Sequence, residues 1–171
     1  KKDQVDSPTK FGQSATADHV YSASEEMQGF TGDKDIVVIH DLATKWTDAF
    51  PVRSKMADDS TWALNEFCGT TYLDFVYVDN SGELNKSIKQ LGFPKGSSTP
   101  GIPATNGIIE NHVKLTLNGA KVILEQAGLP ACFWPEAVRH YWLCRNTVVL
   151  NDDVPSPWEQ RHGKHWVGIH V

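Results

Sequence analysis

The run Ile36-Val37-Val38-Ile39-His40 constrains the fold of this chain more than any other stretch. A continuous apolar, β-branched run of this length is typical of a strand that is buried on both faces. Such a strand belongs in a sheet with helices packed on it. The 171 residues are enough for one domain of this kind.

Three further stretches have the pattern of strands. Together with the first run, the expected strands cover 13–21, 36–40, 45–52 and 74–79. We expect the second and third to form a hairpin that Pro51 stops. A helix is expected to begin at Asp58 or Ser60 and to end before Gly69. The link 81–104, rich in Gly and Pro, allows a short helix around 84–91 and one short edge strand.

The clearest helical pattern runs from about Asn106 to Ala127. Apolar residues recur at steps of three and four and form one stripe: Ile109, Val113, Leu117, Ala120, Leu124 and Ala127. Gly128 is a natural stop, and a second helix is expected to start near Pro135.

This order of elements predicts the fold class α/β, with a mixed central sheet flanked by helices. The strands carrying Asp18 and Asp79 would be parallel neighbours, joined through the intervening helix. We expect an extended lead-in at 1–12, a core at 13–150 and an irregular tail at 151–171. The chain lacks an initial Met, and we expect it to be a piece of something longer.

Composition narrows the class of protein. Apolar residues make up 40% and charged residues 22%, and no apolar run approaches the ~20 residues that cross a bilayer, so we expect no membrane insertion. The three Cys residues form no CxxC pair, which argues against a zinc knuckle and favours a reducing compartment. The net charge of −5 counts against strong DNA binding by this chain alone, but it does not exclude a site that handles DNA through metal ions.

Three carboxylates stand at positions suited to phosphoryl transfer. Asp18 and Asp79 are expected at neighbouring strand ends, and Glu110 in the first turn of the long helix. Carboxylates from different elements can hold the two divalent ions of such a site, and Mg²⁺ prefers oxygen ligands. Taken singly, each Asp is more often a turn residue and the Glu a partner of the helix dipole.

The order of these acids, with the motifs around them, resembles the catalytic core of retroelement integrases, which has a ribonuclease H-like fold. The resemblance is closest to copia-type LTR retrotransposon integrases. The matching segments are Thr16-Ala17-Asp18, 37–46, 78–83, Thr99-Pro100, 105–111, 127–130, 133–137, Arg145-Asn146, 156–159 and Gly163-Lys164.

The resemblance implies metal-dependent DNA cleavage and strand transfer, that is, DNA integration, by a polynucleotidyl transferase. It makes Asp18, Asp79 and Glu110 the catalytic and metal-binding residues, with Mg²⁺ or Mn²⁺ as cofactor. Its implied DNA-binding residues are Lys114, Lys121 and Asn106, although without it Lys114 is a solvated lysine. The implied partners are retroelement ends and target DNA, in a homo-oligomer or larger assembly, in the nucleus or a retroelement particle.

The chain also departs from the family pattern. Residues 80–109 form a shorter spacer between the second and third acids than is usual, Asn111 stands where the family has Arg, and Ser81 replaces a Gly. The alternative hypothesis is therefore a repurposed, inactive integrase-like fold that serves as a structural or interaction subunit. A third hypothesis is a nuclease that only hydrolyses. His162 and His165 could share a helical turn, but we expect them to be solvated tail residues.

Overall fold

The centre of the molecule is a mixed β-sheet. The computed structural model describes residues 7–21, 28–79, 81–97, 103–149 and 153–168, and within them the sheet has five strands in the order β3-β2-β1-β4-β5. The strands are β1 (Ala15–Tyr21), β2 (Asp35–Asp41), β3 (Thr47–Val52), β4 (Val76–Val78) and β5 (Lys95–Ser97). The pairs β1–β2 and β2–β3 are antiparallel, whereas β1–β4 and β4–β5 are parallel, so the predicted mixed sheet is confirmed.

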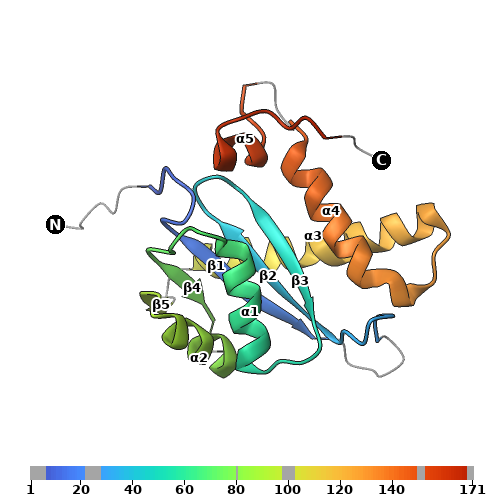
Figure 1. Ribbon diagram of the computed structural model, residues 1–171, viewed down its shortest axis with the longest axis horizontal. Coiled ribbons are helices and arrows are strands. Elements are labelled where there is room, and N and C mark those ends of the chain that lie inside the picture. Colours follow the sequence, from blue (N-terminus) through green and yellow to red (C-terminus); the bar gives the residue numbers. More distant parts are fainter. Residues whose placement is uncertain (1–6, 22–27, 80, 98–102, 150–152, 169–171) are drawn as a thin grey trace.

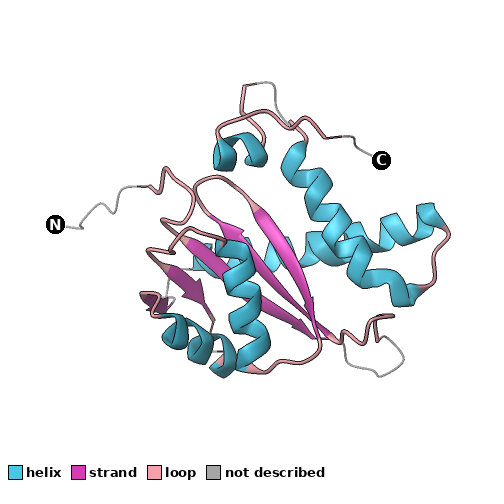
Figure 2. Ribbon diagram, viewed as in Figure 1, coloured by secondary structure: helices cyan, strands magenta, loops and turns pink. Residues whose placement is uncertain are grey.

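Helices cover both faces of this sheet (Figures 1 and 2). One face carries α1 (Ala57–Cys68) and α2 (Gly82–Leu91), while α3 (Pro103–Ala127) passes behind the sheet and packs against α4 (Trp134–Thr147). A short 3₁₀ turn at Ala131–Phe133 precedes α4, and α5 (Pro157–His162) lies beside it. No helix in the described ranges is long and apolar enough to cross a membrane.

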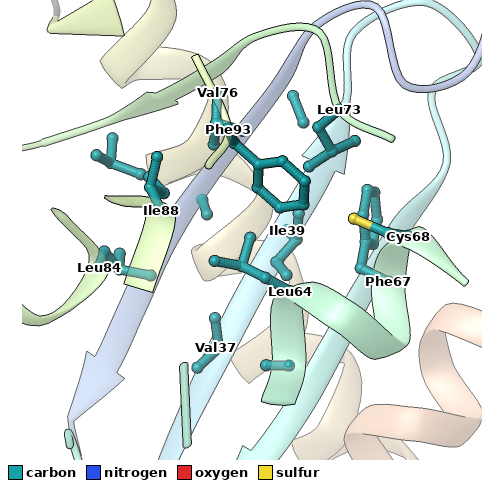
Figure 3. Close-up of a cluster of buried hydrophobic side chains, with 14 of the residues drawn as sticks. Val37, Ile39, Leu64, Phe67, Cys68, Leu73, Val76, Leu84, Ile88 and Phe93 are labelled. Carbon is teal, nitrogen blue, oxygen red and sulfur yellow. The ribbon is translucent and has the colours of Figure 1, made fainter. Parts of the chain in front are cut away.

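The apolar run that predicted a doubly buried strand is β2, and all seven of its residues are buried. Its odd-numbered side chains face one core and its even-numbered ones face the other, as the two-residue period of a strand requires. Val37 and Ile39 pack with α1 and α2 in the first core (Figure 3), whereas Ile36 and Val38 pack with α3 and α4 in the second.

The predicted elements are present, but several boundaries differ: β1 begins at Ala15 and not at residue 13, β4 covers only Val76–Val78, and α1 begins at Ala57. β3 begins at Thr47 instead of residue 45; Pro51 does not stop it, and it runs through Pro51 to its expected end at Val52. It can do so because β3 is an edge strand, where a residue without an N–H removes no bond from a second neighbour. The long helix begins at Pro103, earlier than the expected start near Asn106, so Glu110 lies about two turns inside it.

The two ends of the core are more ordered than expected. Phe11, in the predicted lead-in, packs its ring 5.4 Å from that of Phe67, and the Gly12 N–H donates to Asp41 Oδ2 at 3.0 Å. The irregular tail predicted for 151–171 is wrong at 157–162, because these residues form α5. Ser156 caps this helix by accepting a hydrogen bond from the Glu159 N–H, a local signal that was present in the sequence.

Candidate active site

Two of the predicted acids lie side by side on neighbouring parallel strands. The register of β1 and β4 pairs Ala17 with Val78, so Asp18 and Asp79 are the next residues along each strand. Asp79 directly follows β4, whereas Asp18 lies within β1 and not at its end, which corrects the expected position of that residue. The parallel arrangement expected for this pair is confirmed.

Asp18 is on the side of the sheet that α3 covers. Ala15, Ala17, Val76 and Val78 face the core formed with α1 and α2. By strand alternation, Asp18 points to the opposite face. Asp18 is paired in register with Val38, which belongs to the core beneath α3 and α4. The helix that carries Glu110 therefore lies over the face of β1 to which Asp18 points.

The three carboxylates are within electrostatic range of one another. Burial raises the pKa of Asp18, the His19 N–H that donates to its Oδ1 at 2.8 Å lowers it, and the charges of Asp79 and Glu110 raise it further. A carboxylate that feels two negative neighbours resists ionisation, and a cation beside it would reverse that effect. In the described part of the chain, however, no three His, Cys, Asp or Glu side chains are already close enough together to hold a metal ion.

Glu110 is exposed on α3, and a set of buried contacts next to it fixes the rotation of this helix. Ile109 is buried, and the ring of His112 lies 3.9 Å from that of His40 on β2. The Trp142 ring of α4 stacks on that of His112, with centroids 5.7 Å apart, and its Nε1 donates to Thr116 Oγ1 at 2.8 Å. Because Ile109 and His112 face the sheet, Glu110 is held at the rim between α3 and the strand ends.

Burial disfavours the charged form of both histidines at this contact. It lowers the pKa of His40 to about 3, and the charge of Lys45, like that of a protonated His112, acts in the same direction. Burial also lowers the pKa of His112. The hydrogen bond between its Nδ1 and the Ile108 carbonyl raises this pKa, but by less than burial lowers it. Neutral imidazoles pack against each other without repulsion, so this contact stabilises α3 on the sheet.

The residues predicted to bind DNA lie along the same helix. Lys114 and Lys121 are exposed on α3, about 6 and 16 Å along its axis from Glu110. The side chain of Asn106 lies outside the described residues. The structure therefore leaves both lysines accessible, and their role in DNA binding stays a prediction.

The departures from the family motifs have local structural consequences. Ser81 has φ −65°, which any residue adopts, and its hydroxyl caps α2 by accepting from the Leu84 N–H at 3.4 Å. The serine therefore adds a helix cap where glycine could not. Asn111 is exposed beside Glu110, so no cation replaces the family's arginine at that position.

Sequence reasoning missed one basic residue near the acids. The positive charge of Lys55 lowers the pKa of Asp18, and it lowers the pKa of His19 as well, although burial is the larger cause there. Lys55 lies in the loop before α1, and none of the three acids belongs to that loop. A single lysine in a loop carries no sequence signal of its own.

The histidines near the C-terminus do not form a metal site within the described residues. α5 ends at His162, so His165 does not share a helical turn with it. The His162 ring packs 4.2 Å from that of Trp158, while His165 is exposed and bonds to Glu159. The expectation that His165 is solvated is confirmed.

The fold is α/β, with the ribonuclease H-like architecture of integrase catalytic cores. No protein-family model matches the chain. In structure it is similar to the HTLV-2 integrase catalytic core domain, solved in complex with magnesium in a trimeric form, with TM-score 0.67 and 13% identity over 92% of this chain and all of that one. It is also similar to the BIV integrase catalytic core domain, with TM-score 0.63 and 13% identity over 86% and 92% of the two chains. These likenesses establish the fold.

The donor set fits a hard divalent cation. Carboxylate oxygens are the ligands that Mg²⁺ prefers, and a bound ion would offset both the burial of Asp18, which is the larger cause of its raised pKa, and the repulsion from Asp79 and Glu110. The residues that would hold it are Asp18, Asp79 and Glu110.

Proposed function

We propose that this chain is an integrase-like polynucleotidyl transferase core that cleaves DNA and joins DNA strands with Mg²⁺ or Mn²⁺. The observation that supports this most is the placement of the acids. Asp18 and Asp79 are neighbours in register on parallel strands, and both Asp79 and Glu110 act electrostatically on Asp18. The integrase-core fold supplies the class of chemistry that such a cluster serves.

In this proposal the acids hold the metal and the lysines hold the substrate. The chemistry that bound divalent ions supply at such sites is stabilisation of the attacking and leaving oxygens of an in-line displacement at phosphorus. Asp18, Asp79 and Glu110 are the metal ligands. Lys114 and Lys121 contact DNA phosphates along the exposed face of α3, with Asn106 at its start.

The finer parts of the proposal follow the sequence resemblance. We propose a copia-type LTR retrotransposon integrase that acts on retroelement ends and target DNA, as a homo-oligomer or in a larger assembly. Its place of action is the nucleus or the retroelement particle.

The test compares two Glu→Gln changes on α3. Wild type, Glu110→Gln and Glu125→Gln are incubated with short DNA duplexes and a plasmid target in Mg²⁺, in Mn²⁺ and in EDTA. We expect cleavage by wild type and by the Glu125→Gln control, and a loss of roughly 100-fold or more in Glu110→Gln, because its group acts in the transition state. Joined products in the plasmid distinguish integration from hydrolysis alone. Equal activity of the two variants would contradict the role of Glu110.

A second candidate function is an inactive, repurposed core that serves as a structural or interaction subunit. It is favoured by the absence, among the described residues, of three side chains already gathered for a metal, and by the net charge of −5. A wild-type chain that neither binds Mg²⁺ nor cleaves DNA, yet forms a stoichiometric complex with another protein, would support this candidate.

A further inference from the structure

A cavity of about 350 Å³ opens at the β3 edge of the sheet, away from the acids. Its lining comes from β3 and the preceding residue Trp46, from α1 on one face and from α4 on the other. Two sets of side chains determine what the cavity can bind. The aromatic ones are Trp46, Phe50 and Trp62, and the charged ones are Asp48, Glu66 and Arg139. None of them belongs to the candidate active site.

The aromatic side chains form walls that are only partly covered. Phe50 and Trp62 meet edge to face, with ring centroids 5.9 Å apart, and Trp62 stays 43% exposed. Trp46 is buried, and its Nε1–H has no acceptor among the described residues. Faces of aromatic rings attract cations.

Two carboxylates, those of Asp48 and Glu66, line the cavity together with one arginine, Arg139. Asp48 is partly buried, and its Oδ1 accepts only from the N–H of the adjacent Ala49, at 3.0 Å. Within the described part of the chain neither Asp48 nor Glu66 forms an ion pair. The charged groups that face Asp48 are Glu66 on α1, Arg139 on α4 and Arg161 on α5. Burial raises the pKa of Asp48 to about 6, because its effect is larger than that of the two arginines, which lower the pKa. A cation entering the cavity would favour the charged form of this carboxyl.

We propose that this cavity binds a lysine or arginine side chain presented by a protein partner, with Asp48 and Glu66 as counter-ions and Phe50 and Trp62 as walls. The exposed Trp62 and Leu143 at its lining suit apolar residues on either side of the basic one. DNA is disfavoured as an occupant because its phosphates would meet two carboxylates.

Three blocked peptides test the proposal against the full chain: acetyl-Leu-Arg-Leu-amide, acetyl-Leu-Lys-Leu-amide and the neutral acetyl-Leu-Gln-Leu-amide. Binding is measured by calorimetry and by NMR shifts of the tryptophan indole N–H groups. We expect the two cationic peptides to bind and to shift Trp46 and Trp62, and the Gln peptide to bind about tenfold more weakly or not at all.

Variants then assign the effect to the cavity. Asp48→Asn should weaken binding about tenfold, and Glu66→Gln, at the more exposed position, by about threefold, whereas Glu125→Gln on α3 should leave it unchanged. In wild type the affinity should rise from about pH 5 to pH 7, and Asp48→Asn should abolish that rise. Equal binding of all three peptides, or unchanged binding by Asp48→Asn, would overturn the proposal. Self-association of the chain would also overturn it, if the peptides do not compete with that association and Arg139→Gln removes it. The occupant of the cavity would then be a second copy of the chain.

Discussion

Asp18 combines partial burial with two like-charged neighbours, so the fold holds it at a cost in stability. Its pKa is raised, which means that the unfolded chain releases this proton more readily than the folded chain does. The stability of the folded state therefore falls as the pH rises from the ordinary carboxyl value of 3.8 through the raised pKa. Ionisable residues with strongly shifted pKa values are common at active sites.

The first prediction concerns Asp18→Asn. In EDTA at pH 7 this variant should be more stable than wild type, because it removes a repelled carboxylate, and the advantage should vanish near pH 3. Magnesium should reverse the order. At a concentration one hundred times its Kd, an ion that binds only the folded state adds about 2.7 kcal/mol to the free energy of unfolding. We expect that gain in wild type and not in Asp18→Asn, measured by urea unfolding with and without MgCl₂.

The control for this prediction is Asp58→Asn, which removes a carboxylate in the first turn of α1. It should keep the magnesium response of wild type. A wild-type chain whose urea midpoint ignores magnesium, or an Asp18→Asn variant that still responds fully, would contradict the assignment of Asp18 as a metal ligand.

At the residue scale, the sequence could predict the acids but not their surroundings. Asp18, Asp79 and Glu110 occur in recognisable motifs, and the register and electrostatics of the structure agree with their proximity. Lys55 and Asp48 could not be found in this way. Each depends on what other elements bring beside it, and a single charge in a loop or an edge strand has no periodicity.

At the scale of elements, α3 and α4 pack closely through a glycine. A Cβ built on Gly119 of α3 would lie 2.2–2.5 Å from three ring carbons of Tyr141 on α4. These include Cγ, the ring atom next to the Tyr141 Cβ, so a simple rotation of the ring cannot relieve the clash. Gly119 therefore sets the distance between the helix that carries Glu110 and its support.

The second prediction follows from this contact and has a control on the same helix. Gly119→Ala should lower the free energy of unfolding by about 1–3 kcal/mol, the usual cost of overpacking. A Cβ on Gly107 would meet nothing within 4 Å, so Gly107→Ala should be neutral or should stabilise by about 0.5–1 kcal/mol through helix propensity. Chemical denaturation of both variants measures the difference. Equal stabilisation by both changes would show that α3 and α4 can separate freely.

The elements themselves were predictable where one pattern dominated. β2 has an unbroken apolar run, and α3 has a stripe of regular period, so both occur as expected. The starts of helices were less predictable, because the first turn of α3 lies before its apolar stripe begins. The short α5 escaped prediction although Ser156 and Pro157 form a typical helix start.

At the scale of the whole molecule, α5 joins segments from both ends of the chain. The Arg161 guanidinium lies 3.8 Å from the centre of the Phe11 ring and 4.7 Å from that of Trp46, and its Nη2 donates to the Phe67 carbonyl at 2.8 Å. Trp158 packs on the core, with its ring 5.9 Å from that of Trp46. The lead-in, α1, β3 and α5 thus share one cluster, although the sequence analysis placed residues 1–12 and 151–171 outside the core.

The third prediction is that this cluster makes α5 part of the folding unit. A chain that ends at residue 150 should be less stable than the full chain, because it exposes Phe11, Trp46 and Phe67 and loses the cation above their rings. Trp158→Ala should cost about 2–3 kcal/mol, less than the ~3–5 typical of a fully buried tryptophan, since Trp158 is only partly buried. Val167→Ala is the control from the same segment, because Val167 is 94% exposed and its substitution should cost almost no stability.

The urea midpoints of the full chain, the shortened chain and the two variants show whether α5 belongs to the folding unit. If the chain ending at residue 150 unfolds at the midpoint of the full chain, the core ends at residue 150 as the sequence analysis expected, and α5 is an appendage. If it unfolds earlier and Trp158→Ala reproduces most of the loss, the integrase-like core of this chain needs its C-terminal helix to fold.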